Sequence, residues 1–69
     1  MKVLFYERLQ QLRREKGLTQ CELAKLLNTT QRRISYLETG KIEPDLSTLI
    51  ILSKYFDVSA DYLIGIKDY

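Results

Sequence analysis

The segment 19–40, TQCELAKLLNTTQRRISYLETG, constrains the fold of this chain more than any other part of it. Thr19 followed three residues later by Glu22 is the capping-box signature of a helix N-terminus. Asn28-Thr29 makes a short polar turn, and Thr30 is a suitable cap for a second helix. Apolar residues recur with helical spacing at Leu23, Ala24, Leu27, Ile34 and Leu37. The segment therefore predicts two short helices joined by a tight turn.

Helical periodicity also covers the residues before this segment. Phe5, Leu9 and Leu12 share one face of a helix expected over roughly 5–16. Gly17 supplies a left-handed residue that ends this helix, and Gly40 ends the helix that begins at Thr30 in the same way.

A fourth helix follows the loop 41–44. Pro44 bars a helix from continuing at that point, so the next one starts near Asp45 or Leu46 and runs to about Phe56. Its inner stripe is expected at Leu46, Leu49, Leu52, Ser53 and Phe56.

The remaining residues complete an all-α architecture. Ser59 is a suitable cap for a short fifth helix, which Gly65 ends. No segment alternates between polar and apolar residues for long enough to predict a strand. We therefore expect residues 1–69 to form a single compact domain of five helices.

Length and cysteine content limit where and how the domain is stabilised. A chain of 69 residues accommodates one domain with a small core. Cys21 is the only cysteine, so no internal disulfide can form, and a cytoplasmic location is expected. Its thiol could act as a redox switch, but no histidine accompanies it, and an inert, partly exposed residue is the preferred reading. The longest apolar run, Leu49 to Leu52, is too short to cross a membrane.

The sequence lacks the residues that common catalytic chemistry requires. It contains no histidine, the commonest general base and metal ligand. It also lacks a cysteine pair, an HExxH motif, a glycine-rich phosphate loop and a nucleophile elbow. We therefore expect no enzyme activity, no cofactor and no metal site.

Charge is distributed unevenly along the chain. Residues 1–41 hold nine Lys or Arg against four Glu, a balance of +5, whereas residues 42–69 hold two Lys against five acids, a balance of −3. Such asymmetry indicates a basic face for a polyanion and a separate acidic end. Chance clustering on solvated helix faces is the alternative.

The first turn of the third helix carries the residues with the clearest chemistry. Gln31 offers an amide that pairs with adenine, and Arg32 and Arg33 offer guanidiniums that pair with guanine. Cations at a helix N-terminus oppose the macrodipole by about 0.3–1 kcal/mol each. Two arginines at this position are understandable if an anion binds there, although an ordinary solvated helix start is the alternative. The pattern favours sequence-specific recognition of DNA.

Several spaced motifs agree with one known family. They are Leu18-Thr19-Gln20, Glu22-Leu23-Ala24, Ile34-Ser35, Leu37-Glu38-x-Gly40-Lys41 and Pro44. This pattern resembles the helix-turn-helix of the lambdoid phage repressors, the Cro proteins and the wider Xre group, over residues 5–66. The resemblance implies the five-helix fold of these domains, with the helix-turn-helix at 19–38. Asn28 departs from the family, where glycine is common, but asparagine tolerates the left-handed conformation.

The resemblance assigns a role to individual residues. The residues that it implies contact bases are Gln31, Arg32, Arg33 and Tyr36. Those that it implies contact phosphates are Gln20, Thr30 and Lys41. It also implies an ion pair between Arg13 and Glu38, which could otherwise be separate surface charges. The implied function is transcriptional regulation, as a repressor that binds a palindromic double-stranded DNA operator.

Apolar residues beyond the inner stripe of the fourth helix suggest self-association. We expect a homodimer contact to include Ile50, Ile51, Tyr55, Tyr62 and Ile66. A slightly larger core is the alternative. The rival function is a protein-interaction or antitoxin-like module that uses the fourth and fifth helices and leaves the basic face incidental.

Overall fold

Five α-helices make up the part of the chain that the computed structural model describes, residues 4–66. They are α1 (Phe5–Glu15), α2 (Gln20–Leu26), α3 (Gln31–Thr39), α4 (Leu46–Phe56) and α5 (Ala60–Ile64). The expected all-α fold and the order of its helices are confirmed. The outer ends of the expected domain, residues 1–3 and 67–69, lie outside the described residues.

Side-chain caps explain where most helices begin. The Thr19 hydroxyl accepts a hydrogen bond from the Glu22 backbone N–H, and the Thr19 N–H donates to the Glu22 carboxylate, which completes the predicted capping box. Thr30, Asp45 and Ser59 cap α3, α4 and α5 through single side-chain acceptors. The predicted starts of α2 to α5 follow from these local contacts.

Residues with a left-handed backbone conformation stand at or just after the C-terminal ends of the helices. Gly40 closes α3 with φ +80°, and a Cβ at this position would lie 3.1 Å from Cδ1 of Tyr6. Asn28 has φ +55° in the turn between α2 and α3, as expected for a residue standing where the family commonly has glycine. Asp57 ends α4 with φ +55°, equal to that of Asn28. The sequence did not predict this left-handed aspartate.

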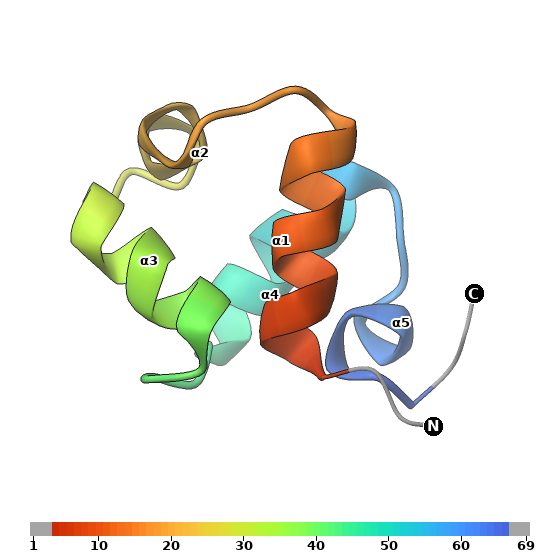
Figure 1. Cartoon of the computed structure of the whole chain (residues 1–69). Coiled ribbons are helices and arrows are strands. Elements are labelled where there is room, and N and C mark those ends of the chain that lie inside the picture. The colour runs from red at the N-terminus through yellow and green to blue at the C-terminus, as the bar shows by residue number, and fades with distance from the viewer. Residues whose placement is uncertain (1–3, 67–69) are drawn as a thin grey trace.

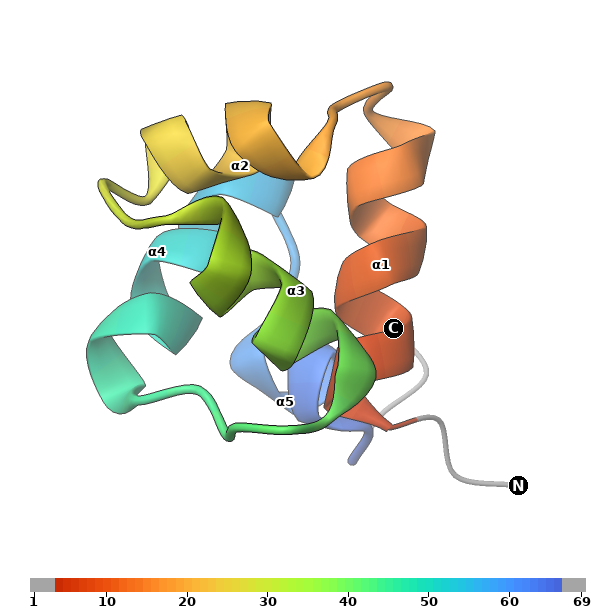
Figure 2. The same ribbon diagram turned by 60° about the vertical axis from the view of Figure 1, so that its left-hand side comes forward.

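The helices surround one apolar core. Helix α3 packs against both α1 and α2, and α5 packs against α1 and α4. Figure 2 shows α3 at the front, with α2 crossing above it and α1 to the right. In Figure 1, α1 lies in the middle of the view and α5 lies beside it at the lower right. The outward side of α3 is thus left uncovered by the other helices.

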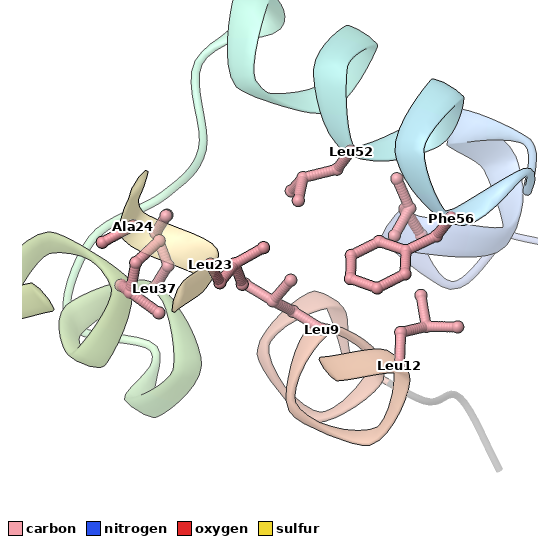
Figure 3. Packing of buried hydrophobic residues seen from close by; sticks show 9 residues of the cluster. Leu9, Leu12, Leu23, Ala24, Leu37, Leu52 and Phe56 are labelled. Carbon is pink, nitrogen blue, oxygen red and sulfur yellow. The ribbon is translucent and has the colours of Figure 1, made fainter. Parts of the chain in front are cut away.

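Figure 3 shows how the core side chains converge from different helices. The buried apolar residues are Leu9, Leu12, Leu23, Ala24, Ile34, Leu37, Leu52, Phe56 and Leu63. Leu49 and Leu27 pack against this cluster and remain half-buried. Every helix therefore contributes at least one side chain to the core.

The prediction that Leu46 belongs to the inner stripe of α4 is wrong. Leu46 is 73% exposed, whereas Leu52 is fully buried. At about 100° per residue, a separation of six residues places the two side chains roughly 120° apart around the helix axis. The sequence also gave no warning of the burial of Arg8 in α1, whose guanidinium lies over the ring of Tyr62 at 3.8 Å from the centroid.

No helix within residues 4–66 combines the length and the apolar character needed to span a lipid bilayer.

Candidate nucleic-acid interface

The inward and outward faces of α3 carry different chemistry. Ile34, Leu37 and Glu38 are buried against the rest of the fold. Arg32 and Thr39 are exposed and Tyr36 is half-buried, and steps of three and four residues place them on the opposite face. This outward face is therefore polar and carries a guanidinium, a phenol and a hydroxyl. Figure 2 shows that no other helix covers this side of the α3 ribbon.

Thr39 extends this face, although sequence analysis did not single it out. Its hydroxyl donates to the Ser35 carbonyl at 2.9 Å, which holds the side chain against the helix. The spacing of seven residues from Arg32 is the signal that could have identified it.

Gln31 is exposed at the first position of α3 and is held by a residue of α2. The Cys21 thiol donates to Oε1 of Gln31, with an Sγ to Oε1 distance of 3.2 Å. Cys21 is exposed, as expected, but it contacts a candidate base-reading residue, which the sequence did not predict.

Arg33 points away from Arg32 and toward the N-terminus of α4. Its Nη2 lies 3.4 Å from Oγ1 of Thr48 and 3.7 Å from Oδ2 of Asp45. The side chains of Arg33 and Asp45 are 36% and 65% exposed, so this ion pair is weak. Hydrogen bonds from Thr48 are the main cause that lowers the pKa of Asp45, and the charge of Arg33 contributes less.

The three expected phosphate ligands lie on different elements. Gln20, at the start of α2, donates from Nε2 to Oε1 of Glu38 at 3.1 Å. The hydroxyl of Thr30 accepts from the Arg33 backbone N–H and caps α3. Lys41 is exposed just after α3, and its Nζ lies 5.2 Å from the ring centroid of Tyr36.

The ion pair between Arg13 and Glu38 is present and joins α1 to α3. Nε and Nη2 of Arg13 donate to the two carboxylate oxygens of Glu38 at 2.6 and 3.0 Å. Nη1 donates to the Leu18 carbonyl at 2.7 Å, in the loop before α2. The Arg13 side chain is 11% exposed and that of Glu38 is 1% exposed. The hydrogen bond to Glu38 is the main cause that raises the pKa of Arg13.

This buried pair fixes the helix-turn-helix against α1. Glu38 receives hydrogen bonds from both Arg13 and Gln20, so one carboxylate of α3 is bound to α1 and α2 together. The arrangement sets the position of α3 without using any side chain on its outward face.

The expected dimer residues differ in how exposed they are. Ile50, Ile51, Tyr55 and Ile66 are exposed. Tyr62 is half-buried, and the guanidinium of Arg8 covers one face of its ring. Ile50 and Ile51 are adjacent in α4, so they diverge by about 100° around its axis. The exposed apolar side chains of α4 thus cover a broad sector of its surface.

No group of three or more His, Cys, Asp or Glu side chains within residues 4–66 is arranged to hold a metal ion.

Fold and site together define a helix-turn-helix domain, in which α2 and α3 are the two helices and the outward face of α3 is exposed and polar. The sequence profile of the Helix-turn-helix family matches residues 9–63, and the chain belongs to this family.

Two similar proteins are named as regulators of transcription. The HTH-type transcriptional activator BcrR of Enterococcus faecalis is 45% identical over 61 residues, which are 88% of this chain and 30% of that protein. The SPbeta prophage-derived HTH-type regulator YonR of Bacillus subtilis is 43% identical over 61 residues, 88% of this chain and 56% of that protein. The chain therefore spans only part of these relatives.

A solved structure of similar fold is the P22 c2 repressor in complex with synthetic operator 9T. It superposes with a TM-score of 0.86 at 31% identity, covering 94% of this chain and 98% of that chain.

Proposed function

We propose that this domain binds double-stranded DNA in a sequence-specific manner and regulates transcription, with α3 in the major groove. The observation that supports this proposal most is the exposure of Gln31 and Arg32 at the first turn of α3, while the opposite face of the helix is buried. Tyr36 and Thr39 continue the same outward surface. A helix with an unobstructed polar side matches the width of the major groove, where base edges carry a distinct pattern of donors and acceptors.

The phosphate contacts that we propose remain compatible with the internal hydrogen bonds. An amide nitrogen has two hydrogens, so Gln20 keeps one donor for a phosphate after it binds Glu38. The Thr30 oxygen accepts the capping bond, which leaves its O–H free to donate. Backbone N–H groups in the first turns of α2 and α3 favour anions, and Lys41 adds a charge after α3.

We propose that Arg33 contributes to DNA binding from the edge of this surface. Its contacts with Thr48 and Asp45 are long, at 3.4 and 3.7 Å, and the Asp45 carboxylate is exposed, so a nearby phosphate or base competes with them. Arg32 needs no such rearrangement, because it is exposed on the outward face.

We further propose that the domain is a repressor that binds a palindromic operator as a homodimer. The likeness to the P22 c2 repressor covers nearly all of that chain, whereas the match to the activator BcrR covers 30% of that protein. Two copies related by a two-fold axis would place their α3 helices about 34 Å apart, on half-sites one turn apart. Exposed Ile50, Ile51, Tyr55 and Ile66 are the proposed contact, with a smaller contribution from Tyr62. We propose a cytoplasmic location, because operator binding requires access to cellular DNA.

Selection of binding sites from a random duplex pool tests this function, followed by affinity measurements at several salt concentrations. We expect a recurrent palindromic site and a log K that falls by about 0.9 per phosphate neutralised as log salt rises. Arg32→Ala should cost about 1–3 kcal/mol and relax preference at one base position. The matched control is Arg14→Ala, an exposed arginine on α1, which should change affinity for all sequences alike.

A protein-interaction module is the second candidate function, and exposed apolar side chains on α4 favour it. Ile50 and Ile51 are 48% and 44% exposed. A mobility-shift assay with random duplex DNA at low salt separates the two functions. Absence of any retained complex would favour the interaction module.

A further inference from the structure

Cys21 and Gln31 connect the two helices of the helix-turn-helix at its exposed edge. They are the second residue of α2 and the first residue of α3. The turn between these helices, with Asn28 in the left-handed conformation, brings the side chains together. The contact runs from the Cys21 thiol to Oε1 of Gln31, with 3.2 Å between sulfur and oxygen.

A thiol that donates to a glutamine favours one of the two orientations of its amide, with the oxygen toward the sulfur. The S–H group finds its acceptor at the amide oxygen, and the NH₂ end carries only donors. Without such a contact the terminal torsion of glutamine is broad, with two nearly equivalent amide orientations. Oε1 keeps a second lone pair and Nε2 keeps two hydrogens. A held amide can therefore still offer the donor and acceptor that pair with adenine.

We infer that Cys21 is a positioning residue for Gln31, which sets the orientation of the base-reading amide without touching DNA. This inference rests on the proposed function. Within residues 4–66 the Gln31 side chain makes no other side-chain hydrogen bond, and both residues are exposed. Their contact adds little to the core, so its effect is expected in base selectivity and not in folding.

Five proteins test the inference: the parent, Cys21→Ala, Cys21→Ser, Gln31→Ala and the double variant that combines the two alanine changes. Each is assayed at fixed salt and under reducing conditions against the selected operator and its single-base variants. The readout is the ratio of dissociation constants at each base position. Random duplex DNA reports affinity without selectivity, and a thermal melt reports folding.

Gln31→Ala identifies the base position that this amide reads. We expect Cys21→Ala to lower discrimination at that same position by about 2- to 10-fold, the cost of ordering one flexible side chain. Discrimination at other positions, affinity for random duplex and the melting temperature should stay at parent values. Cys21→Ser keeps a donor and should restore the parent ratio. In the Gln31→Ala background, Cys21→Ala should have no further effect.

Two results would overturn the inference. One is parent-like discrimination at every position in Cys21→Ala, and the other is an equal loss with and without Gln31. Both leave the proposed function standing, because the parent still selects an operator. A parent that selects no operator removes the proposed function and this inference with it.

Discussion

Loss of the Arg13 charge is predicted to remove a large part of the stability of this domain. Arg13 gives two hydrogen bonds to the buried carboxylate of Glu38 and one to the Leu18 carbonyl. Arg13→Met keeps much of the aliphatic stem, but it leaves the Glu38 carboxylate with the Gln20 amide as its remaining side-chain partner among the described residues. An uncompensated buried charge costs about 3–5 kcal/mol.

The loss expected for Arg13→Met is a large fraction of the free energy of unfolding of the whole domain. At about 0.05–0.15 kcal/mol per residue, a chain of this length has roughly 3–10 kcal/mol of stability. Since 1 kcal/mol shifts the midpoint of a small domain by about 4–8 °C, the melting temperature should fall by more than about 12 °C. The variant should be partly unfolded at room temperature if the parent lies at the lower end of this range.

Urea denaturation followed by helical circular dichroism measures the change. Arg33→Met is the matched control, because its partner Asp45 is exposed and the expected loss is about 0–1 kcal/mol. Replacing both members of the buried pair, Arg13→Met with Glu38→Leu, should recover much of the stability. A loss in Arg13→Met no larger than in the control would refute the reasoning, since the pair would then behave as a solvent-screened one.

Three further predictions follow from single features. Gly40→Ala should cost about 1–2 kcal/mol in urea denaturation, because φ is +80° and the new methyl meets Tyr6, while Gly17→Ala, at φ +71° with open space around it, should cost less. The pKa of Asp45 is lower in the folded state than the ordinary carboxylate value of about 4, so its ionised form stabilises the fold at any pH above that value. This stabilisation is lost as the pH falls through the lower pKa of the folded state. Asp45→Asn, which keeps a capping side chain, should therefore flatten the fall in melting temperature with acid, and an unchanged acid limb would contradict this. Ile51→Lys should weaken self-association in sedimentation velocity if the proposed dimer uses this side of α4, and an unchanged association constant would exclude it.

Features that depend on three or four neighbouring residues were predicted correctly from the sequence. The capping box of Thr19 and Glu22 is formed between residues three apart. The caps Thr30 and Ser59 likewise need only the backbone N–H of the first helical turn. Ile34 and Leu37 are both buried, because a spacing of three residues places them on one face of α3. Local hydrogen bonding and helical periodicity therefore determine the element boundaries.

Features that depend on distant residues could not be predicted from the residues alone, and the Arg13–Glu38 pair was expected only through the family resemblance. Arg8 is buried because it stacks on Tyr62, which comes from α5 at the other end of the chain. Arg33 faces α4 because the fold brings Thr48 and Asp45 beside it, and nothing in the sequence around Arg33 records this. A long charged side chain has many rotamers, and its direction is chosen by partners that only the tertiary structure supplies.

In the candidate site, too, features set by neighbouring residues were predicted and a contact between distant residues was missed. The helix that carries Gln31 and Arg32 was predicted from its own residues, and both lie exposed as recognition would require. The hydrogen bond from Cys21 was missed, because a cysteine and a glutamine ten residues apart carry no mutual signal. The role of each residue toward DNA stays a prediction.

Chemical-shift mapping of the labelled protein during titration with its selected duplex tests the central claim most directly. The account predicts that the largest changes fall on Gln31, Arg32, Tyr36 and Lys41, along the uncovered side of α3. Changes confined to α4 and α5, with the signals of α3 unmoved, would contradict it.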